Sequence, residues 1–222
     1  MNQRTNAVKI THENTLEWIF SSKLPFWSSF TDWLKSDKEK LYWISGKPGS
    51  GKSALMKFLV NILVETRANC HNRGNSKEQN QQQNEEGTSE KSRDDSSLLE
   101  ATYLKPCTVV ISHFLWEAGN FMQNSIKGAQ LGLLRQLLCC EPSLADKILD
   151  GLPGSERKDD DDDWSSHELG LWTARTLSAC KRPVCIFLDG LDEISPSYGP
   201  IEVIDLVKEL SGIANVKVCV SS

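Results

Sequence analysis

The chain has 222 residues, of which 39% are apolar and 25% charged, and its formal net charge is -5. This length allows one sizeable domain with its own hydrophobic core. An excess of acidic residues argues against a nucleic-acid-binding surface, and no apolar run approaches the roughly 20 residues of a membrane-spanning helix. We therefore expect a globular protein with neither nucleic acid nor membrane among its partners.

The amino terminus and the seven cysteines indicate a reducing compartment. Residues 1–15 contain no apolar stretch of the kind that a secretory signal needs. No CxxC pair occurs, so neither a disulfide framework nor a zinc site is indicated. Cys107, Cys185 and Cys219 lie within apolar runs, where a thiol packs like a small apolar side chain. We expect the protein to be cytoplasmic.

The first part of the chain predicts a helical lead-in, a strand and a long helix. Apolar residues in 13–38 recur at helical spacing and are interrupted by Pro25, which predicts two short helices within a lead-in of residues 1–40. Residues 41–45 form an apolar run typical of a strand, and 53–70 have helical periodicity. A polar stretch of about 71–100 cannot bury enough surface to order itself, so we expect a disordered insertion there.

The second part alternates apolar strands with helices. Its predicted elements are, in order, a strand over 107–116, a helix over 123–140, an acidic loop over about 154–164, a helix over 165–180 capped by Ser165 or Ser166, a strand over 184–189, a helix over 201–213 and a strand over 216–222. The aspartate run of the acidic loop is typical of a solvated segment rather than of a metal site. Continuously apolar strands that alternate with helices predict an α/β fold, with a mainly parallel sheet between two helical layers.

Residues 46–53, GKPGSGKS, match the phosphate-binding loop pattern GxxxxGK[ST] between a predicted strand and a predicted helix. The glycines let the backbone wrap closely, so that successive N–H groups point at phosphate oxygens; an ordinary glycine-rich turn is the alternative. Lys52 supplies a charge for the β- and γ-phosphates, and the Ser53 hydroxyl ligates Mg²⁺. The predicted nucleotide-contacting residues are Gly46, Lys47, Pro48, Gly49, Ser50, Gly51, Lys52, Ser53 and Ala54.

Three acids follow the apolar strand in FLDGLDE, residues 187–193. Because Mg²⁺ takes only one or two carboxylates beside phosphates and water, Asp189 at the strand end is the predicted metal partner, either directly or through a water molecule. Asp192 and Glu193 follow in a turn that could bring either to the γ-phosphate, and we predict them as catalytic residues. The alternative is that they are first-turn acids that complement a helix dipole.

These motifs together resemble a known family. WISGKPGSGKSALMKF with CIFLDGLDE resembles the NACHT domain, a P-loop NTPase of the STAND class, and the small residue Gly190 followed by Asp192 and Glu193 is its more discriminating part. THENTLEWIF, ISHFLW and GLLRQLL are similar to nephrocystin-type NACHT proteins of filamentous fungi. The resemblance covers most of residues 10–222 apart from the two polar segments, and it makes 41–222 the NTPase core.

The resemblance implies a nucleotide switch. Its members bind ATP, less often GTP, with Mg²⁺, and nucleotide exchange lets them self-associate and activate partner proteins in NLR-like non-self recognition and programmed cell death. In that family an arginine follows the last strand, whereas this chain stops at Ser222, so we expect a truncated domain with a sheet that is incomplete on its carboxyl-terminal side. Residues 41–45 should then form an uncovered edge that favours association.

Several functions remain open at this point. The first is a switch module with slow, Mg²⁺-dependent ATP hydrolysis. The second is a non-hydrolysing interaction or scaffold domain that keeps the P-loop fold. A small-molecule kinase is disfavoured because no lid-like arginine cluster occurs, and a Ras-like GTPase because no NKxD element for guanine occurs.

Overall fold

The computed structural model describes residues 16–21, 29–75, 107–149, 160 and 163–222. The helices are η2 (Glu17–Phe20), α2 (Phe30–Lys35), α3 (Lys52–Asn75), α5 (Ile126–Cys140), α6 (Ser143–Leu149), α7 (Ser166–Ala179), η5 (Leu191–Glu193) and α8 (Pro200–Ser211). The strands are β1 (Leu41–Ile44), β2 (Val109–Phe114), β3 (Val184–Asp189) and β4 (Val216–Ser221). No helix in the described part of the chain has the length and apolar character needed to cross a membrane.

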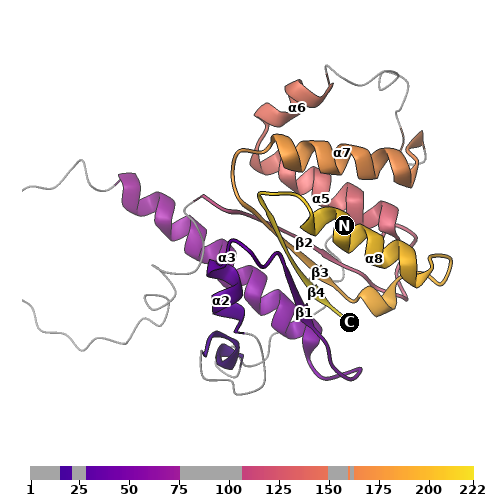
Figure 1. The fold of residues 1–222 in the computed structure, drawn as a ribbon, viewed down its shortest axis with the longest axis horizontal. Helices are drawn as coiled ribbons and strands as arrows, with labels where there is room; N and C mark the ends of the chain where they lie inside the picture. The colour runs from indigo at the N-terminus through magenta and orange to yellow at the C-terminus, as the bar shows by residue number, and fades with distance from the viewer. Residues whose placement is uncertain (1–15, 22–28, 76–106, 150–159, 161–162) are drawn as a thin grey trace, which may run out of the picture.

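The four strands form one parallel sheet in the order β1-β4-β3-β2. Helices α2 and α3 cover one face, and α5, α7 and α8 cover the other (Figure 1). Residues of β3 alternate between these layers: Ile186 and Leu188 pack in the core beneath α5, α7 and α8, while Cys185 and Phe187 pack in the core beneath α3. Because both faces are buried, the strand is apolar without alternation. The predicted α/β/α architecture is confirmed.

The two edge strands of the sheet, β1 and β2, differ in what contacts their outer side. Among the described residues β1 pairs only with β4, and its Leu41 and Trp43 side chains are exposed, so the expected uncovered edge is present. At the opposite edge the Gln136 side chain from α5 donates to the Ser112 carbonyl at 2.8 Å and accepts from the Ser112 N–H at 3.1 Å. This amide takes the place of a pairing strand on β2, which β1 lacks. Association through β1 stays a prediction.

Most predicted elements have their expected places, with three corrections. Helix α3 continues to Asn75, into the stretch predicted as a disordered insertion, and the rest of that stretch, residues 76–100, lies outside the described residues. Helix α6 was not predicted. Cys107 is exposed and precedes β2 rather than packing in a strand, whereas Cys185 and Cys219 are buried. Burial raises the pKa of Cys185 to about 12 and also raises that of Cys219, so both thiols stay neutral and pack as apolar groups.

Helix α7 shows why local sequence determines its start. The Ser165 side chain accepts from the Glu168 N–H at 3.2 Å, and the Glu168 carboxylate accepts from the Ser165 N–H at 2.9 Å. This reciprocal capping box satisfies two donors that have no partner within the helix. The predicted cap at Ser165 is confirmed.

Two lysines, Lys40 and Lys217, bind main-chain carbonyl groups at the end of the sheet where the strands begin. Lys217 of β4 donates to the carbonyl oxygens of Trp33 and Ser36, and its ammonium lies 5.2 Å from the Trp33 ring centroid. Lys40 donates to the Ala214 carbonyl at 2.8 Å. Both line a cavity of about 170 Å³ at this edge, remote from the loop that follows β1. Because these ammonium groups cap α2 and the loop before β4, we assign them a structural role.

Buried His113 predicts a stability that falls at acidic pH. Burial lowers its pKa to about 4 from 6.5, and its Nε2 has no hydrogen-bond partner among the described residues. The unfolded chain therefore binds a proton near pH 6.5, where the folded chain does not, so stability is lost as pH falls from about 6.5 to about 4. The expected loss is about 3 kcal/mol. Urea unfolding between pH 7 and pH 4 measures it.

The variant His113→Leu should flatten this dependence, because no group at position 113 then takes up a proton. His167→Gln, at an exposed position of α7, is the matched control and should leave the pH dependence as in wild type. An unchanged slope in His113→Leu would assign the acid sensitivity to other groups.

Candidate functional site

The glycine-rich loop connects β1 with the amino end of α3, as the motif requires. Gly49 and Gly51 have φ values of 75° and 88°, which side chains rarely adopt. A Cβ on either would meet no atom within 4 Å, so glycine is needed there for conformation rather than for space. At Gly46 a Cβ would lie 2.9 Å from Ser50 Oγ, but the Ser50 side chain is exposed and can rotate away, so this position has a weaker requirement for glycine.

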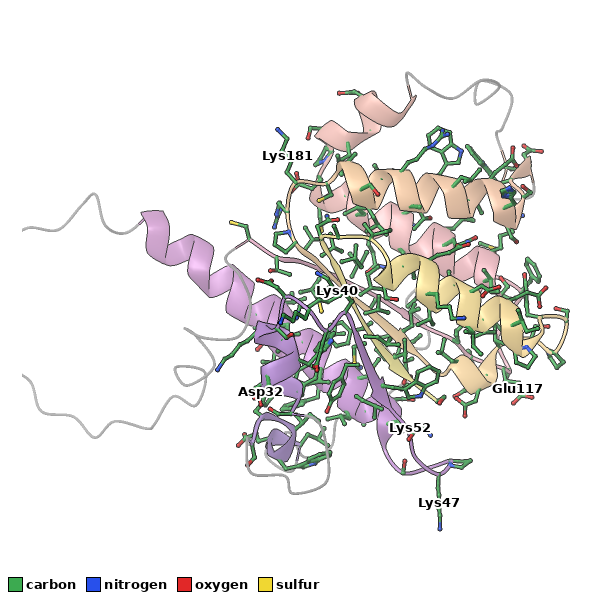
Figure 2. All side chains as sticks on the ribbon, in the orientation of Figure 1. Asp32, Lys40, Lys47, Lys52, Glu117 and Lys181 are labelled. Carbon is green, nitrogen blue, oxygen red and sulfur yellow. The ribbon has the colours of Figure 1, made fainter. Side chains whose placement is uncertain are left out.

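The ammonium group of Lys52 folds back over the loop. Its Nζ donates to the Gly46 carbonyl at 2.8 Å and to the Lys47 carbonyl at 3.3 Å. Figure 2 shows Lys52 at the end of the sheet, whereas Lys47 extends away from the domain at the tip of the loop. Of the two lysines in the motif, only Lys52 is therefore placed to act on a group bound within the loop.

The predicted loop residues differ in how far their side chains are exposed to solvent. The tip, which consists of Lys47, Pro48, Gly49, Ser50 and Gly51, is exposed. Lys52, Ser53 and Ala54 begin α3 and are half-buried. The Gly51 carbonyl accepts from the Leu55 N–H at 2.9 Å, so the helix starts directly behind the tip. N–H groups at a helix amino terminus favour an anion there.

Asp189 is the last residue of β3 and is only 1% exposed. Its Oδ1 accepts a hydrogen bond from Ser221 Oγ at 2.5 Å, and the same Oγ accepts from the Gly190 N–H at 3.1 Å. Because the carboxyl ends of parallel strands lie at one edge of a sheet, the structure brings Asp189 to the edge that carries the loop after β1.

Gly190 turns the chain away from the sheet directly after Asp189. Its φ is 73°, and a Cβ there would lie 3.2 Å from the Leu115 carbonyl oxygen. The positive φ strongly favours glycine at this position, and the close approach of the Leu115 carbonyl adds to that preference. The following 3₁₀ helix η5 contains Asp192 and Glu193.

Asp192 and Glu193 lie in different surroundings. Asp192 is exposed. Glu193 is half-buried, and its Oε2 accepts from the Glu117 N–H at 3.3 Å, in the loop between β2 and α5. Figure 2 places Glu117 at the same end of the molecule as Lys52. The turn thus carries both predicted catalytic acids next to Asp189 in the chain, with Glu193 held toward the β2–α5 loop.

Two further residues, which the motifs did not indicate, connect the loop with Asp189. Ser221 contacts Asp189 and Gly190 on one side of β4. On the other side the Ser222 carbonyl accepts from the Gly46 N–H at 3.3 Å, and its N–H donates to the Ile44 carbonyl at 3.2 Å. A hydroxyl residue at a strand end was the available signal, but its meaning depends on β4 lying between β1 and β3.

The donors at this edge fit a magnesium–nucleotide complex. Asp189 and Ser53 offer the hard oxygen atoms that Mg²⁺ prefers, and Lys52 offers the compensating charge for phosphate. The described residues contain no group of three or more histidines, cysteines and acids that could hold a metal by themselves. Mg²⁺ commonly uses few protein ligands and takes the others from phosphate and water, so the absence of such a group among the described residues does not argue against a magnesium site.

The fold and the loop together define a P-loop-like α/β/α domain. A protein-family model described as "Nephrocystin 3, N-terminal" matches residues 14–90 and 91–222. The chain belongs to this family. No match was found among curated proteins.

Proposed function

We propose that this domain binds a nucleoside triphosphate, ATP in the first place and GTP as the second choice, together with Mg²⁺. The observation that carries the proposal is the loop of residues 46–53, where the Lys52 ammonium rests on the Gly46 and Lys47 carbonyl oxygens. Carbonyl and phosphate oxygens both accept hydrogen bonds from an ammonium group, so Lys52 can exchange these two carbonyl contacts for contacts with phosphate oxygens.

Different groups at the site would bind the phosphates and the metal ion. Main-chain N–H groups of the loop and the start of α3 bind phosphate oxygens, and Lys52 neutralises their charge. Ser53 and Asp189 would hold Mg²⁺. When bound, this ion would offset the negative charge of the phosphate groups. The buried position of Asp189 strengthens its attraction for a cation, because few water molecules screen it.

Slow hydrolysis is the part of the proposal that depends on Asp192 and Glu193. Either carboxylate, in the turn after Asp189, can orient or deprotonate a water molecule that attacks the terminal phosphate. Asp192 is the stronger candidate of the two, because Glu193 already accepts a hydrogen bond from Glu117.

The biological role that we propose is that of a NACHT-type switch in an NLR-like signalling protein. Membership of the nephrocystin 3 N-terminal family supports this role. The resemblance of the chain's glycine-rich loop and FLDGLDE segment to the NACHT domain supports it as well. Nucleotide exchange would control self-association and contacts with protein partners in the cytoplasm. The uncovered β1 edge offers main-chain groups for such association.

A second candidate function is a non-hydrolysing interaction domain, in which the nucleotide only stabilises the fold. The hydrogen bond from Glu117 to Glu193 favours it, because it uses one of the two acids that hydrolysis would need. The two functions share nucleotide binding and differ in the release of phosphate.

One experiment tests both functions. Fluorescent ATP and GTP analogues are titrated into the protein with Mg²⁺, and phosphate release is then measured for wild type and Asp192→Asn. We expect saturable ATP binding, and release that falls about a hundredfold in the variant, as expected for loss of a general base. Equal, measurable release would remove Asp192 from catalysis, and binding without release would support the scaffold. No binding of either nucleotide would overturn the proposed function.

A further inference from the structure

The carboxyl end of β4 places two neighbouring serines between the loop and the acid. Strand β4 pairs with β1 on one side and with β3 on the other. Ser221 directs its side chain to β3, where it contacts Asp189 and Gly190. Ser222 instead contacts β1, through its main chain and through its Oγ, which accepts from Trp43 Nε1 at 2.9 Å. The two serines therefore contact different parts of the site.

The hydrogen bonds of Ser221 have a defined direction. A hydroxyl has one proton to donate and lone pairs to accept with. The Gly190 N–H is a donor only, so Ser221 Oγ accepts from it and has its proton for Asp189 Oδ1, 2.5 Å away. Ser221 is fully buried, so water does not compete for either bond.

This contact orients a carboxylate without cancelling its charge. An arginine or lysine in the same place would pair with Asp189 and compete with a cation for it. A neutral hydroxyl leaves the negative charge available. A hydrogen-bond partner of a metal-binding carboxylate restricts the rotation of the carboxylate and leaves its negative charge in place.

The contact also differs from the hydroxyl contacts that only support local structure. Thr176, for example, donates to the Trp172 carbonyl of its own helix at 2.7 Å. Ser221 reaches a carboxylate 32 positions away in the sequence, on a neighbouring strand and at the sheet edge that carries the loop.

We propose that Ser221 is a positioning residue that holds the Asp189 carboxylate in the orientation that binds the Mg²⁺ of the nucleotide. The inference rests on the proposed function, because it assigns Mg²⁺ to Asp189. It adds that Ser221 acts on affinity for the metal ion and leaves the contacts of the loop with phosphate unchanged.

The test separates metal-dependent from metal-independent binding. A fluorescent ATP analogue is bound to wild type, Ser221→Ala, Ser221→Thr and Ser222→Ala, with Mg²⁺ varied and also with EDTA. We expect Ser221→Ala to raise the Mg²⁺ concentration at half-maximal effect by about tenfold, as loss of a carboxylate's hydrogen-bond partner does. Binding in EDTA should stay within about twofold of wild type, because Lys52 and the loop are intact.

Two variants control for structure. Ser221→Thr keeps the hydroxyl and should restore the wild-type Mg²⁺ dependence. Ser222→Ala removes a hydroxyl one residue away that contacts Trp43 instead, and should leave that dependence unchanged. Electron paramagnetic resonance of Mn²⁺ in place of Mg²⁺ reports the bound ion directly, without hydrolysis.

The outcomes distinguish the inference from the proposed function. If wild type binds the nucleotide but Ser221→Ala has the wild-type Mg²⁺ dependence, the positioning role is wrong and the proposed function stands. The same follows if Ser221→Ala weakens binding equally with Mg²⁺ and with EDTA, since that indicates a general structural role. If wild type binds no nucleotide, both fail.

Discussion

Lys52→Ala is expected to remove most of the stabilisation that Mg-ATP gives to this domain. At a ligand concentration one hundred times its Kd, wild type should gain about 2.7 kcal/mol. For a domain of this size this gain corresponds to roughly 5–10 °C in Tm. The variant loses the ammonium that folds over the loop, and a charged hydrogen bond of this kind contributes about 1.5–3 kcal/mol. Its affinity should fall by up to about a hundredfold.

At the same ATP concentration the variant would then be near its own Kd, and its gain would be only about 0.4 kcal/mol. The measurement is thermal unfolding with and without Mg-ATP, compared within each variant, because loss of the contacts with Gly46 and Lys47 can also change the stability of the free protein.

Lys47→Ala is the matched control for this prediction. Lys47 belongs to the same loop and carries the same charge, but its side chain extends away from the domain (Figure 2). Its loss should change the shift produced by Mg-ATP by no more than a degree or two, as expected for an exposed charge. A normal shift in Lys52→Ala, or equal losses in both variants, would contradict the assigned role of Lys52.

Phe187→Ala is expected to be the most destabilising single change considered. Phe187 lies in the middle of β3, one of the two inner strands, is fully buried, and packs in the core beneath α3. Its truncation leaves a cavity that a sheet paired on both sides cannot close, at a cost of about 3–5 kcal/mol. The corresponding fall in Tm is roughly 6–20 °C. Urea unfolding gives the free energy directly.

Phe121→Ala controls for the loss of a phenyl ring as such. Phe121 lies in the loop before α5 and is 53% exposed. Its truncation should change the free energy of unfolding by about 0.5 kcal/mol or less. If the two variants were equally stable, β3 could not be the centre of the core.

Local signals in the sequence were enough for the site loop and for the elements that begin with strong caps. The GKPGSGKS pattern predicts its own conformation, because glycine is strongly favoured where φ is positive, and Gly49 and Gly51 adopt such values. The capping box at Ser165 and the unbroken apolar run of β3 likewise depend on neighbouring residues only. Their boundaries could be read within one or two residues.

Helix α6 shows where local signals end. Pro142 lies just beyond the predicted helix over 123–140, where a proline is compatible both with the end of that helix and with the start of another. A helix as short as Ser143–Leu149 has little stability of its own, and burial of Leu144 in the core of α5, α7 and α8 supplies it. This contact exists only after α5 and α7 have packed.

The sequence by itself determined which segments become strands and where a phosphate-binding loop forms, because side-chain polarity and glycine placement act over a few residues. Only the tertiary structure decided the strand order. All four strands are apolar enough to pair with any of the others, so their order depends on how the helices pack across the two faces. That order places β4 between β1 and β3, and so brings Ser221 to Asp189 and Ser222 to Gly46. No spacing within the chain encodes these contacts.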